Sequence, residues 1–334
     1  MRRRILVTGV TGQVGGALVE ALRPRGLVIP ADRAQIDLSR PHEIAAALDA
    51  LAPDLIINPA AYTAVDRAED ERELAFRANG EAPGVIARWA AGRVNVVPLV
   101  HFSTDYVFDG SGTRPWREDD PTGPLSVYGA SKLAGEQAVR AAGGVHLIIR
   151  TSWVYAATGA NFLRTIGRLA RERTELRIVA DQIGAPTSAR LIAQAVARII
   201  GDSGAGGDRR TRAEGVEAII SADGHDGGAL LAERFAAAGG CVHLAAAGET
   251  NWHGFASAIV AGLQARSVPL AVKQVTPIST ADYPTRARRP ANSRFDLTRL
   301  SRFFHVEPAT WEQALSTELD QLARELLDVG GPAR

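Results

Sequence analysis

Tyr128 and Lys132 have the residue types and the spacing of a proton-donating pair. They stand four positions apart in a segment, 127–142, whose pattern predicts a helix, so both side chains share one face. With five tyrosines and two lysines in 334 residues, such a pair arises by chance in roughly 3% of chains of this composition. An ammonium group beside a phenol favours the phenolate and moves its pKa from about 10 toward neutral pH. We therefore expect Tyr128 to be a general acid that Lys132 tunes; the alternative is a surface tyrosine beside a solvated lysine.

A hydroxyl at the end of a predicted strand completes this set. The apolar segment 96–103 reads as a buried strand, and Ser103, Thr104 and Asp105 stand at its carboxyl end. Ligands bind at that edge in doubly wound sheets, so Thr104 can hydrogen-bond a substrate carbonyl beside Tyr128. Simple capping of a turn is the alternative explanation for these polar residues. Thr104, Tyr128 and Lys132 are the predicted catalytic residues.

Three glycines predict a site for a dinucleotide. Gly9, Gly12 and Gly15 follow the predicted strand 5–8 and open the predicted helix 15–23. Glycines allow a tight turn and a close approach of the backbone to a pyrophosphate, and the free N–H groups of the helix favour negative charge. The spacing differs from the tighter Gly-x-Gly-x-x-Gly form, so the position between strand and helix carries the inference.

Charged residues after the second predicted strand concern the choice of cofactor. Asp32 stands 20 residues after Gly12, where an acid binds the ribose hydroxyls of NAD. The adjacent Arg33 could instead accommodate the 2′-phosphate of NADP, so NADPH or NADH both remain open. Asp37 and Leu38 are predicted to contact the adenine end. The alternative is that Asp32 and Asp37 are solvated turn residues.

The elements that must position these residues follow an alternating pattern. Short apolar runs alternate with helical patterns through residue 150, which predicts an α/β fold with a doubly wound parallel sheet of the Rossmann type. Segments 41–51 and 69–89 read as helices, the second interrupted near Gly80 and Pro83. We predict a cofactor-binding domain at 1–155 and a smaller α/β substrate-binding lobe at 156–334, with segments that return to the first domain. The Gly-, Asp- and Arg-rich stretch 201–228 reads as a flexible insertion.

Composition excludes several classes of protein. The chain has 46% hydrophobic residues, a net charge of +1 and one cysteine, and its apolar runs are shorter than 18 residues. A disordered chain, a membrane span, a dedicated nucleic-acid binder and a disulfide scaffold are therefore not expected. The short apolar run after the N-terminal arginines does not fit a signal peptide, so we expect a cytoplasmic protein with Cys241 in its core. The seven histidines lack metal-ligand spacing, and no metal site is expected.

Longer motifs resemble the extended short-chain dehydrogenase/reductases, and among them reductases of nucleotide-bound 4-keto-6-deoxy sugars. The resemblance runs from end to end. The motifs that carry it are Thr8-Gly-Val-Thr-Gly-Gln-Val-Gly15, Asn58-Pro-Ala-Ala-Tyr-Thr-Ala-Val-Asp66, Ser103-Thr-Asp-Tyr-Val-Phe108, Tyr128-Gly-Ala-Ser-Lys132, Arg150-Thr-Ser-Trp-Val-Tyr155, Asp181-Gln-Ile-Gly-Ala-Pro-Thr187 and Arg288-Arg-Pro-Ala-Asn-Ser-Arg294. The first and fourth are typical of the whole superfamily, and the Trp153, Gly-Ala-Pro-Thr and Arg-Arg-Pro motifs are typical of these reductases.

The resemblance implies a reaction and a set of contacts. Hydride would pass from NADPH or NADH to C4 of dTDP-4-dehydro-β-L-rhamnose, a dTDP-sugar, giving dTDP-β-L-rhamnose for cell-surface polysaccharide. Tyr128 would protonate the new alkoxide, Lys132 would hold the nicotinamide ribose, and Thr104 would polarise the ketone. The implied cofactor contacts are Gly9, Thr11, Gly12, Gln13, Val14, Gly15, Asp32, Arg33, Asp37, Leu38, Ala60, Ala61, Thr63, Tyr128 and Lys132. The implied sugar-nucleotide contacts are Thr104, Asp105, Trp153, Arg288 and Arg289; the alternatives are a core tryptophan and a solvated basic loop.

Other functions on the same fold compete with this one. A dehydratase needs a second acid after the threonine, and here Tyr106 follows Asp105; an epimerase, another 4-ketoreductase and a non-catalytic NAD(P)-binding regulatory subunit also stay open. Some relatives form magnesium-bridged dimers through acids at two places where this chain has Ala17 and Arg190. The expectation is therefore a homodimer, if any, without a metal bridge.

Overall fold

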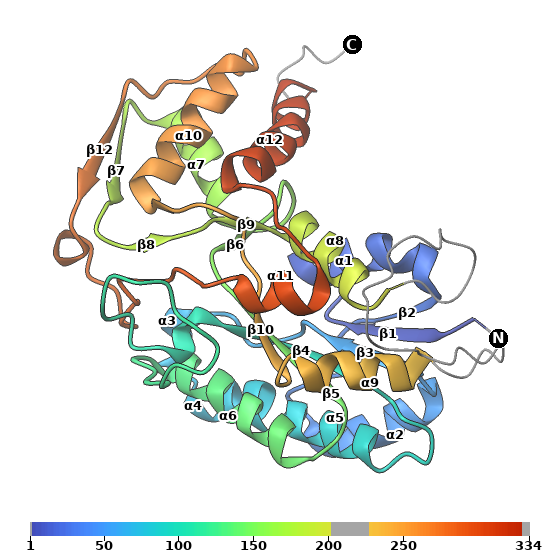
Figure 1. The fold of residues 1–334 in the computed structure, drawn as a ribbon. Helices are drawn as coiled ribbons and strands as arrows, with labels where there is room; N and C mark the ends of the chain where they lie inside the picture. Colours follow the sequence, from blue (N-terminus) through green and yellow to red (C-terminus); the bar gives the residue numbers. More distant parts are fainter. Residues whose placement is uncertain (1, 202–226, 329–334) are drawn as a thin grey trace.

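A parallel sheet forms the centre of the computed structural model, which describes residues 2–201 and 227–328 (Figure 1). Within those ranges the sheet has six strands in the order β10-β5-β4-β3-β1-β2, and every neighbouring pair is parallel. The strand order reverses between β1 and β3, so the space beyond their carboxyl ends is the switch point where such sheets bind ligands. The α/β doubly wound fold is thus as predicted.

Five of the six strands described in the sheet, and the helices between them, match the predicted alternation closely. The elements are β1 (Arg4–Thr8), α1 (Gln13–Leu22), β2 (Leu27–Ala31), α2 (Pro41–Leu51), β3 (Leu55–Asn58), α3 (Val65–Ala68), α4 (Arg72–Phe76), a π-helical turn (Arg77–Glu81), α5 (Ala82–Ala91), β4 (Leu99–Thr104), a short 3₁₀ turn (Asp105–Val107), α6 (Val127–Ala141) and β5 (His146–Thr151). The predicted interruption near Gly80 is the π-helical turn. Pro41 begins α2. Proline suits this position because the first N–H groups of a helix have no partner within the helix.

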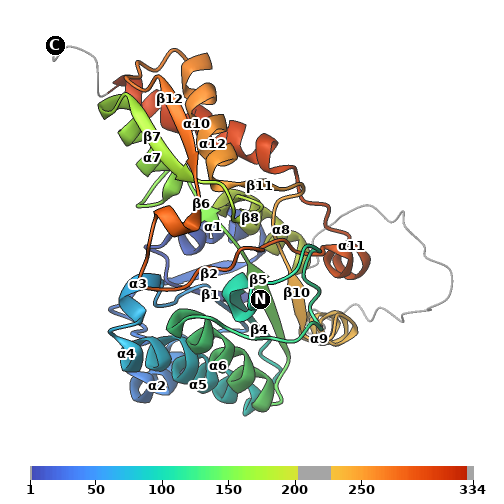
Figure 2. The same cartoon turned by 90° about the vertical axis from the view of Figure 1, so that its left-hand side faces the viewer.

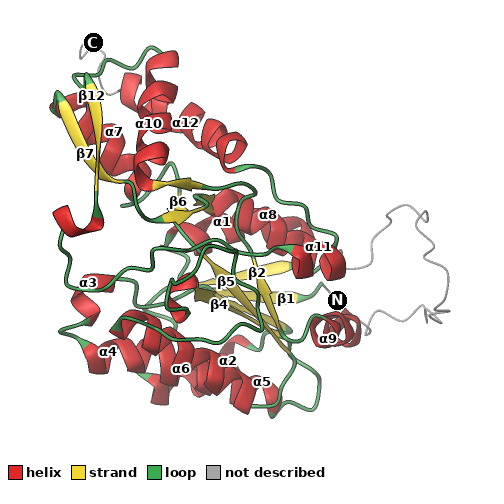
Figure 3. Ribbon diagram, turned by 60° about the vertical axis from the view of Figure 1, so that its left-hand side comes forward, coloured by secondary structure: helices red, strands yellow, loops and turns green. Residues whose placement is uncertain are grey.

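Side chains alternate between the two faces of the sheet, which explains its two helical layers. On β1, Ile5 and Val7 belong to one hydrophobic cluster with α1 and α8, while Leu6 belongs to the other with α2 and α5. This is the period-two alternation of a strand whose two faces are both covered. Figures 1 and 3 show α1 and α8 above the sheet and α2, α5 and α6 below it.

The rest of the chain builds a second lobe and returns to the sheet. Its elements are β6 (Val154–Tyr155), α7 (Phe162–Glu172), β7 (Glu175–Val179), β8 (Ile183–Gly184), β9 (Thr187–Ser188), α8 (Ala189–Ile199), α9 (Gly227–Ala237), β10 (Cys241–His243), β11 (Thr250–Asn251), α10 (Trp252–Ala265), β12 (Gln274–Ile278), α11 (Thr298–Phe304) and α12 (Trp311–Asp328). In Figure 2, β7, β12, α7, α10 and α12 stand together at the top, away from α2 and α5. Strand β10 returns to the sheet beside β5.

The domain boundaries and the insertion stay predictions. Most of the predicted insertion at 201–228, namely 202–226, lies outside the described residues.

In the described ranges, no helix is long and apolar enough to cross a membrane. Cys241 is buried on β10, and burial raises the pKa of its thiol to about 11, so it is a core residue as expected.

Candidate functional site

A cleft of about 1570 Å³ opens at the carboxyl ends of β1, β3, β4 and β5. Its lining includes the loop after β1, the segment after β3, the end of β4, the first turns of α6 and the segment after β5. Residues of α8, which lies beside α1 above the sheet, and of α12 in the second lobe also line it. A cleft of this size exceeds the usual range for one small ligand, so it has room for two large ones.

The glycine loop is built as the sequence predicts. Gly9 has a φ of +58°, and a Cβ there would stand 2.9 Å from Cα of Ala60. A Cβ on Gly15 would stand 2.2 Å from the carbonyl oxygen of Gly9, so α1 can pack this close to the turn only without a side chain there. Gly12 immediately precedes α1 and has no side chain that could cap the first N–H groups of this helix. These N–H groups are therefore available to an anion.

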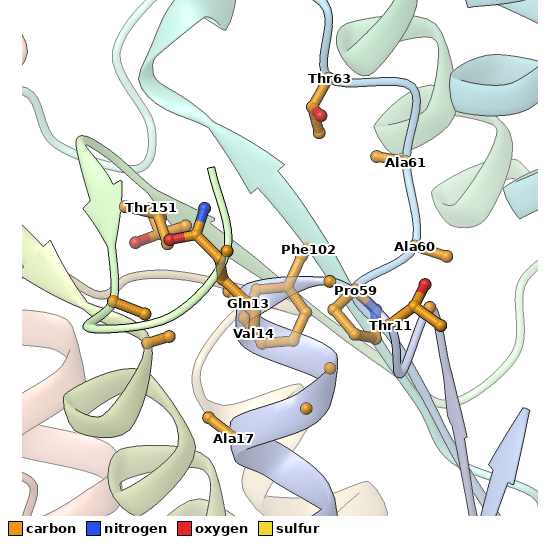
Figure 4. A pocket seen from close by; sticks show the side chains of 18 of the residues that line it. Thr11, Gln13, Val14, Ala17, Pro59, Ala60, Ala61, Thr63, Phe102 and Thr151 are labelled. Carbon is orange, nitrogen blue, oxygen red and sulfur yellow. The ribbon is translucent and has the colours of Figure 1, made fainter. Parts of the chain in front are cut away.

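Unsatisfied polar atoms in the cleft fit a nicotinamide dinucleotide. Among the described residues, Gln13 Oε1, Thr151 Oγ1 and Ser152 Oγ are buried without a hydrogen-bond partner, and all three residues line the cleft. Such atoms are costly unless a ligand or water pairs with them. Figure 4 shows the start of α1 and the segment after β3 lining the cleft together, with Thr11, Gln13, Val14, Ala60, Ala61 and Thr63 labelled. The predicted cofactor contacts in both segments therefore share one cleft.

Asp32 and Arg33, the two candidates for contacting the adenosine ribose of the cofactor, make different contacts in the structure. The Asp32 carboxylate turns back on its own loop, where Oδ1 accepts hydrogen bonds from the N–H groups of Ala34 and Gln35. Arg33, Asp37 and Leu38 line the cleft, and Asp32 is not among its described lining residues. Arg33 donates to Asp37 at 3.3 Å and is otherwise largely exposed. The choice between a ribose contact and a turn residue for Asp32 stays a prediction.

Tyr128 and Lys132 lie in the cleft as their spacing predicts. Ser126 caps α6 by accepting from the N–H of Gly129, which fixes where the helix begins. Lys132 is 2% exposed, and its Nζ donates to the carbonyl oxygen of Phe102 on β4 at 2.6 Å. Burial lowers the pKa of Lys132 to about 8, and the nearby Glu136 opposes that change.

Burial dominates the pKa of Tyr128 in the chain by itself. It raises that pKa to about 12, against a hydrogen bond with Thr104 that lowers it. The expected lowering by Lys132, helped by the charge of an oxidised nicotinamide, concerns the cofactor-bound site and stays a prediction. A high pKa keeps the phenol protonated at neutral pH, which is the state that a proton donor needs. Tyr106 packs edge-on against the Tyr128 ring, with centroids 5.4 Å apart.

Thr104 and Asp105 form a buried polar pair at the end of β4. Thr104 Oγ1 donates to Asp105 Oδ1 at 2.9 Å, and Ser293 Oγ donates to Asp105 Oδ2 at 2.5 Å. Burial raises the pKa of Asp105 to about 6, and both hydrogen bonds oppose the rise. Asp105 lines the cleft, but its carboxylate is already occupied by two donors.

Trp153 lies on the cleft wall, and its ring is fixed by contacts with Trp252 and Gly184. Its ring stacks on Trp252 of α10 with centroids 3.7 Å apart, and a Cβ on Gly184 would stand 2.7 Å from the ring. Its backbone has a φ of +50°, a strained conformation for a large side chain that such packing can hold. The tryptophan therefore presents a fixed aromatic surface to the cleft.

Arg288 and Arg289, the predicted contacts of the sugar nucleotide, lie outside the described lining of the cleft. Arg288 is exposed, and Arg289 pairs with Asp66 after β3 at 2.7 Å; the described lining of the cleft includes neither. Their contact with a sugar nucleotide stays a prediction. Arg190 lines the cleft and donates to Glu318 of α12 at 2.9 Å, which ties α8 to the C-terminal helix.

Sequence reasoning missed the buried polar chain beneath the cleft. Thr8 Oγ1 donates to Asn58 Oδ1 at 2.6 Å, and the Asn58 amide meets Nδ1 of His101 at 3.2 Å. Burial lowers the pKa of His101 well below its usual value, so this histidine is neutral. These hydrogen bonds link the last residues of β1 and β3 to the middle of β4. The signal in the sequence is a polar residue within or at the end of each of these apolar strands. Ser293, which holds Asp105, stands in the quoted Arg-Arg-Pro motif without a role of its own.

Comparison with known proteins gives a consistent family. The family model described as RmlD substrate binding domain matches residues 3–209 and 228–324. The chain is 46% identical to a dTDP-4-dehydrorhamnose reductase of Burkholderia thailandensis over 93% of this chain and 96% of that protein. It is 38% identical to the dTDP-4-dehydrorhamnose reductase of Escherichia coli over 95% of this chain and 97% of that one.

Solved structures agree. A dTDP-4-dehydrorhamnose reductase from Clostridium acetobutylicum superposes with a TM-score of 0.79 at 30% identity, over 96% of this chain and 99% of that one. The enzyme of the same name from Bacillus anthracis, solved in complex with NADP, has a TM-score of 0.77 at 31% identity, over 96% of this chain and the whole of that one.

Proposed function

The chain belongs to the dTDP-4-dehydrorhamnose reductase family, and from this membership we propose that it reduces the C4 ketone of dTDP-4-dehydro-β-L-rhamnose to give dTDP-β-L-rhamnose. It is an NAD(P)H-dependent oxidoreductase. The observation that carries the proposal is the presence of Thr104, Tyr128 and Lys132 in one cleft with the glycine loop.

The chain's own residues supply binding and the proton. NADPH or NADH, when bound, supplies the hydride. The loop from Gly9 to Gly15 and the start of α1 would hold the pyrophosphate, and the unsatisfied atoms of Gln13, Thr151 and Ser152 would pair with polar groups of the cofactor. Lys132, which donates to the Phe102 carbonyl, would hydrogen-bond the ribose.

The proton comes from the phenol of Tyr128. Because its pKa is about 12, Tyr128 holds its proton until the C4 oxygen becomes an alkoxide, which is a much stronger base. Thr104 hydrogen-bonds the ketone oxygen, and the Lys132 ammonium stabilises the phenolate that remains after transfer. Trp153 supplies the wall against which the sugar ring packs.

The test follows absorbance at 340 nm with dTDP-4-dehydro-β-L-rhamnose and either reduced cofactor. Tyr128→Phe removes only the hydroxyl, so we expect kcat to fall by about 10²–10⁴-fold while cofactor affinity is retained. Tyr283→Phe is the matched control, since Tyr283 is exposed and outside the cleft lining.

Two results would contradict the proposal. Wild-type protein that binds both cofactors but consumes neither with this sugar would exclude the substrate, and a different keto sugar or a regulatory role would then lead. A Tyr128→Phe variant as active as Tyr283→Phe would exclude Tyr128 as the donor.

A homodimer without a metal bridge and a cytoplasmic place of action stay predictions; a single buried thiol suits that compartment.

A further inference from the structure

A segment from the C-terminal third of the chain reaches Asp105, the residue that follows the predicted catalytic threonine, Thr104. Ser293 donates its hydroxyl proton to the Asp105 carboxylate, although the two residues are 188 positions apart. Both are buried, with Ser293 1% and Asp105 2% exposed. A hydrogen bond to a buried carboxylate is among the stronger polar contacts in a protein, so its loss should be measurable.

The backbone around Ser293 is fixed on two sides. Ser293 donates its N–H to the carbonyl of Ile183 at 2.8 Å, and the N–H of Asn292 reaches the carbonyl of Gly110 at 3.1 Å. Gly110 has a φ of +71°, and a Cβ there would stand 2.5 Å from Pro290. The segment 290–293 therefore fits against the loop after β4 and against β8, and the Ser293 hydroxyl has a defined position.

Thr104 has one hydroxyl proton, and two acceptors compete for it: the Asp105 carboxylate and, in the proposed reaction, the ketone oxygen of the substrate. In the structure that proton goes to Asp105 Oδ1, while the Thr104 oxygen accepts from the N–H of Tyr106 at 3.3 Å and interacts with the Tyr128 hydroxyl. If Thr104 is to donate to the ketone, it must turn the proton away from Asp105. The buried carboxylate then loses one of its two side-chain donors at the moment of reaction, which costs free energy unless the other donor stays.

We propose that Ser293 is a positioning residue for the reduction: it keeps the buried Asp105 carboxylate hydrogen-bonded while Thr104 turns its proton to the substrate ketone. The inference rests on the proposed function, in which Thr104 contacts the ketone. Ser293 touches neither substrate nor cofactor in this scheme, and acts only through Asp105.

The test is a double-mutant cycle of Ser293→Ala and Asp105→Asn, measured on kcat and on the KM for NADPH. We expect Ser293→Ala to lower kcat by about tenfold and to leave the KM for NADPH within twofold. In the Asp105→Asn background the carboxylate charge is gone, so the added Ser293→Ala change should alter kcat less than twofold. A merely structural role for Ser293 would give the same factor in both backgrounds.

Controls separate this effect from loosening of the loop. Thr285→Ala removes a hydroxyl that bonds to the carbonyl of Ala287 within the same loop and does not reach Asp105, so its kcat should equal that of wild type. Thermal unfolding and NADPH binding check that each variant is folded. If wild type reduces the sugar and Ser293→Ala keeps kcat within twofold, the role of Ser293 is excluded and the reductase stands. If wild type does not reduce the sugar, the proposed function falls and this inference with it.

Discussion

Burial acts in opposite directions on the two residues predicted to carry the proton chemistry. It raises the pKa of Tyr128 and lowers that of Lys132, because desolvation disfavours the charged form of each. Tyr128 thereby keeps its proton at neutral pH, whereas Lys132 loses its proton near the upper end of the physiological range. The pH range of the enzyme is therefore expected to depend on the lysine.

The loss of the Lys132 proton predicts an alkaline limit. With a pKa of about 8, Lys132 is an ammonium below that pH and neutral above it, so kcat/KM for NADPH should fall as pH rises through about 8. Lys132→Met should be weakly active and should lack this limb. A wild-type profile that stays level to pH 9.5, measured by absorbance at 340 nm, would contradict the assignment.

Arg33 predicts a preference for NADPH. Arg33 lines the cleft, and its largely exposed guanidinium donates to Asp37 at 3.3 Å and to Ser39 at 3.5 Å, while Asp32 accepts hydrogen bonds from its own turn. A solvent-exposed guanidinium can pair with a 2′-phosphate. Arg33→Ala should therefore lower kcat/KM for NADPH about tenfold or more and leave the value for NADH within twofold.

The control for this prediction is Arg40→Ala. Arg40 is exposed beside the same Asp37 and is not among the described residues of the cleft lining, so its loss should leave both values unchanged. Equal losses with both cofactors in Arg33→Ala would show that Arg33 supports the loop and does not read the phosphate.

At the scale of elements, the fit of α1 onto its preceding turn decides whether the cofactor site exists. A side chain at Gly15 would collide with the carbonyl of Gly9, which is backbone and cannot turn aside. Gly15→Ala should therefore lower the free energy of unfolding by about 1–3 kcal/mol and weaken NADPH binding.

Gly123→Ala is the matched control for that change. Its Cβ would meet Asp109 Cβ at 3.5 Å, an ordinary contact, so stability and cofactor affinity should stay close to wild type. Thermal unfolding and fluorescence titration with NADPH measure both quantities. A Gly15→Ala variant that binds NADPH with wild-type affinity would show that α1 can move without disturbing the site.

Local pattern predicted the long elements well and the short ones poorly. Apolar strands such as β1 and β3 and amphipathic helices such as α2 and α6 carry a periodic signal of their own. The two-residue strands β6, β8, β9 and β11 carry none, since pairing with distant segments defines them, and the helix α11 is only seven residues long. The sequence thus predicted the strands and helices that carry the cleft and missed the short elements of the second half of the chain.

The same distinction applies to the candidate site. Tyr128 and Lys132 lie on one helix, so their spacing alone brought them together. Asp32, Arg289 and Ser293 could not be judged in this way, because a turn, an ion pair with Asp66 and a carboxylate 188 residues away decide what each side chain does. Long-range partners of polar residues leave no periodic trace in a single sequence.

At the scale of the whole molecule, one hydrophobic cluster joins the sheet to the second lobe. It extends from Ile5 and Val7 of β1 through α8 to Leu319 and Leu322 of α12. Phe255 of α10 is fully buried in it, with ring contacts to Tyr155, Phe162, Trp252 and Trp311. The two lobes are therefore expected to unfold together.

Phe255→Ala tests that cooperativity. Removing this ring should cost about 3–5 kcal/mol and lower the Tm of a single transition seen by both tryptophan fluorescence and circular dichroism. Val94→Ala is the comparison, because Val94 is fully exposed and its loss should leave the Tm unchanged. A variant with two transitions, one still at the wild-type temperature, would show that the lobes are independent.

The contact between Ser293 and Asp105 also has a consequence for synthesis on the ribosome. Chains emerge at about 5–20 residues per second, so the 188 residues between the two positions take roughly 10–40 s to appear. The glycine loop and the Tyr128–Lys132 helix are all translated before Ser293. In the later part of that interval, after Ser152, the nascent chain has the sequence of its proposed cofactor-binding loops and lacks the hydroxyl that pairs with Asp105. The hydrogen bond between Ser293 and Asp105 therefore forms only late in synthesis.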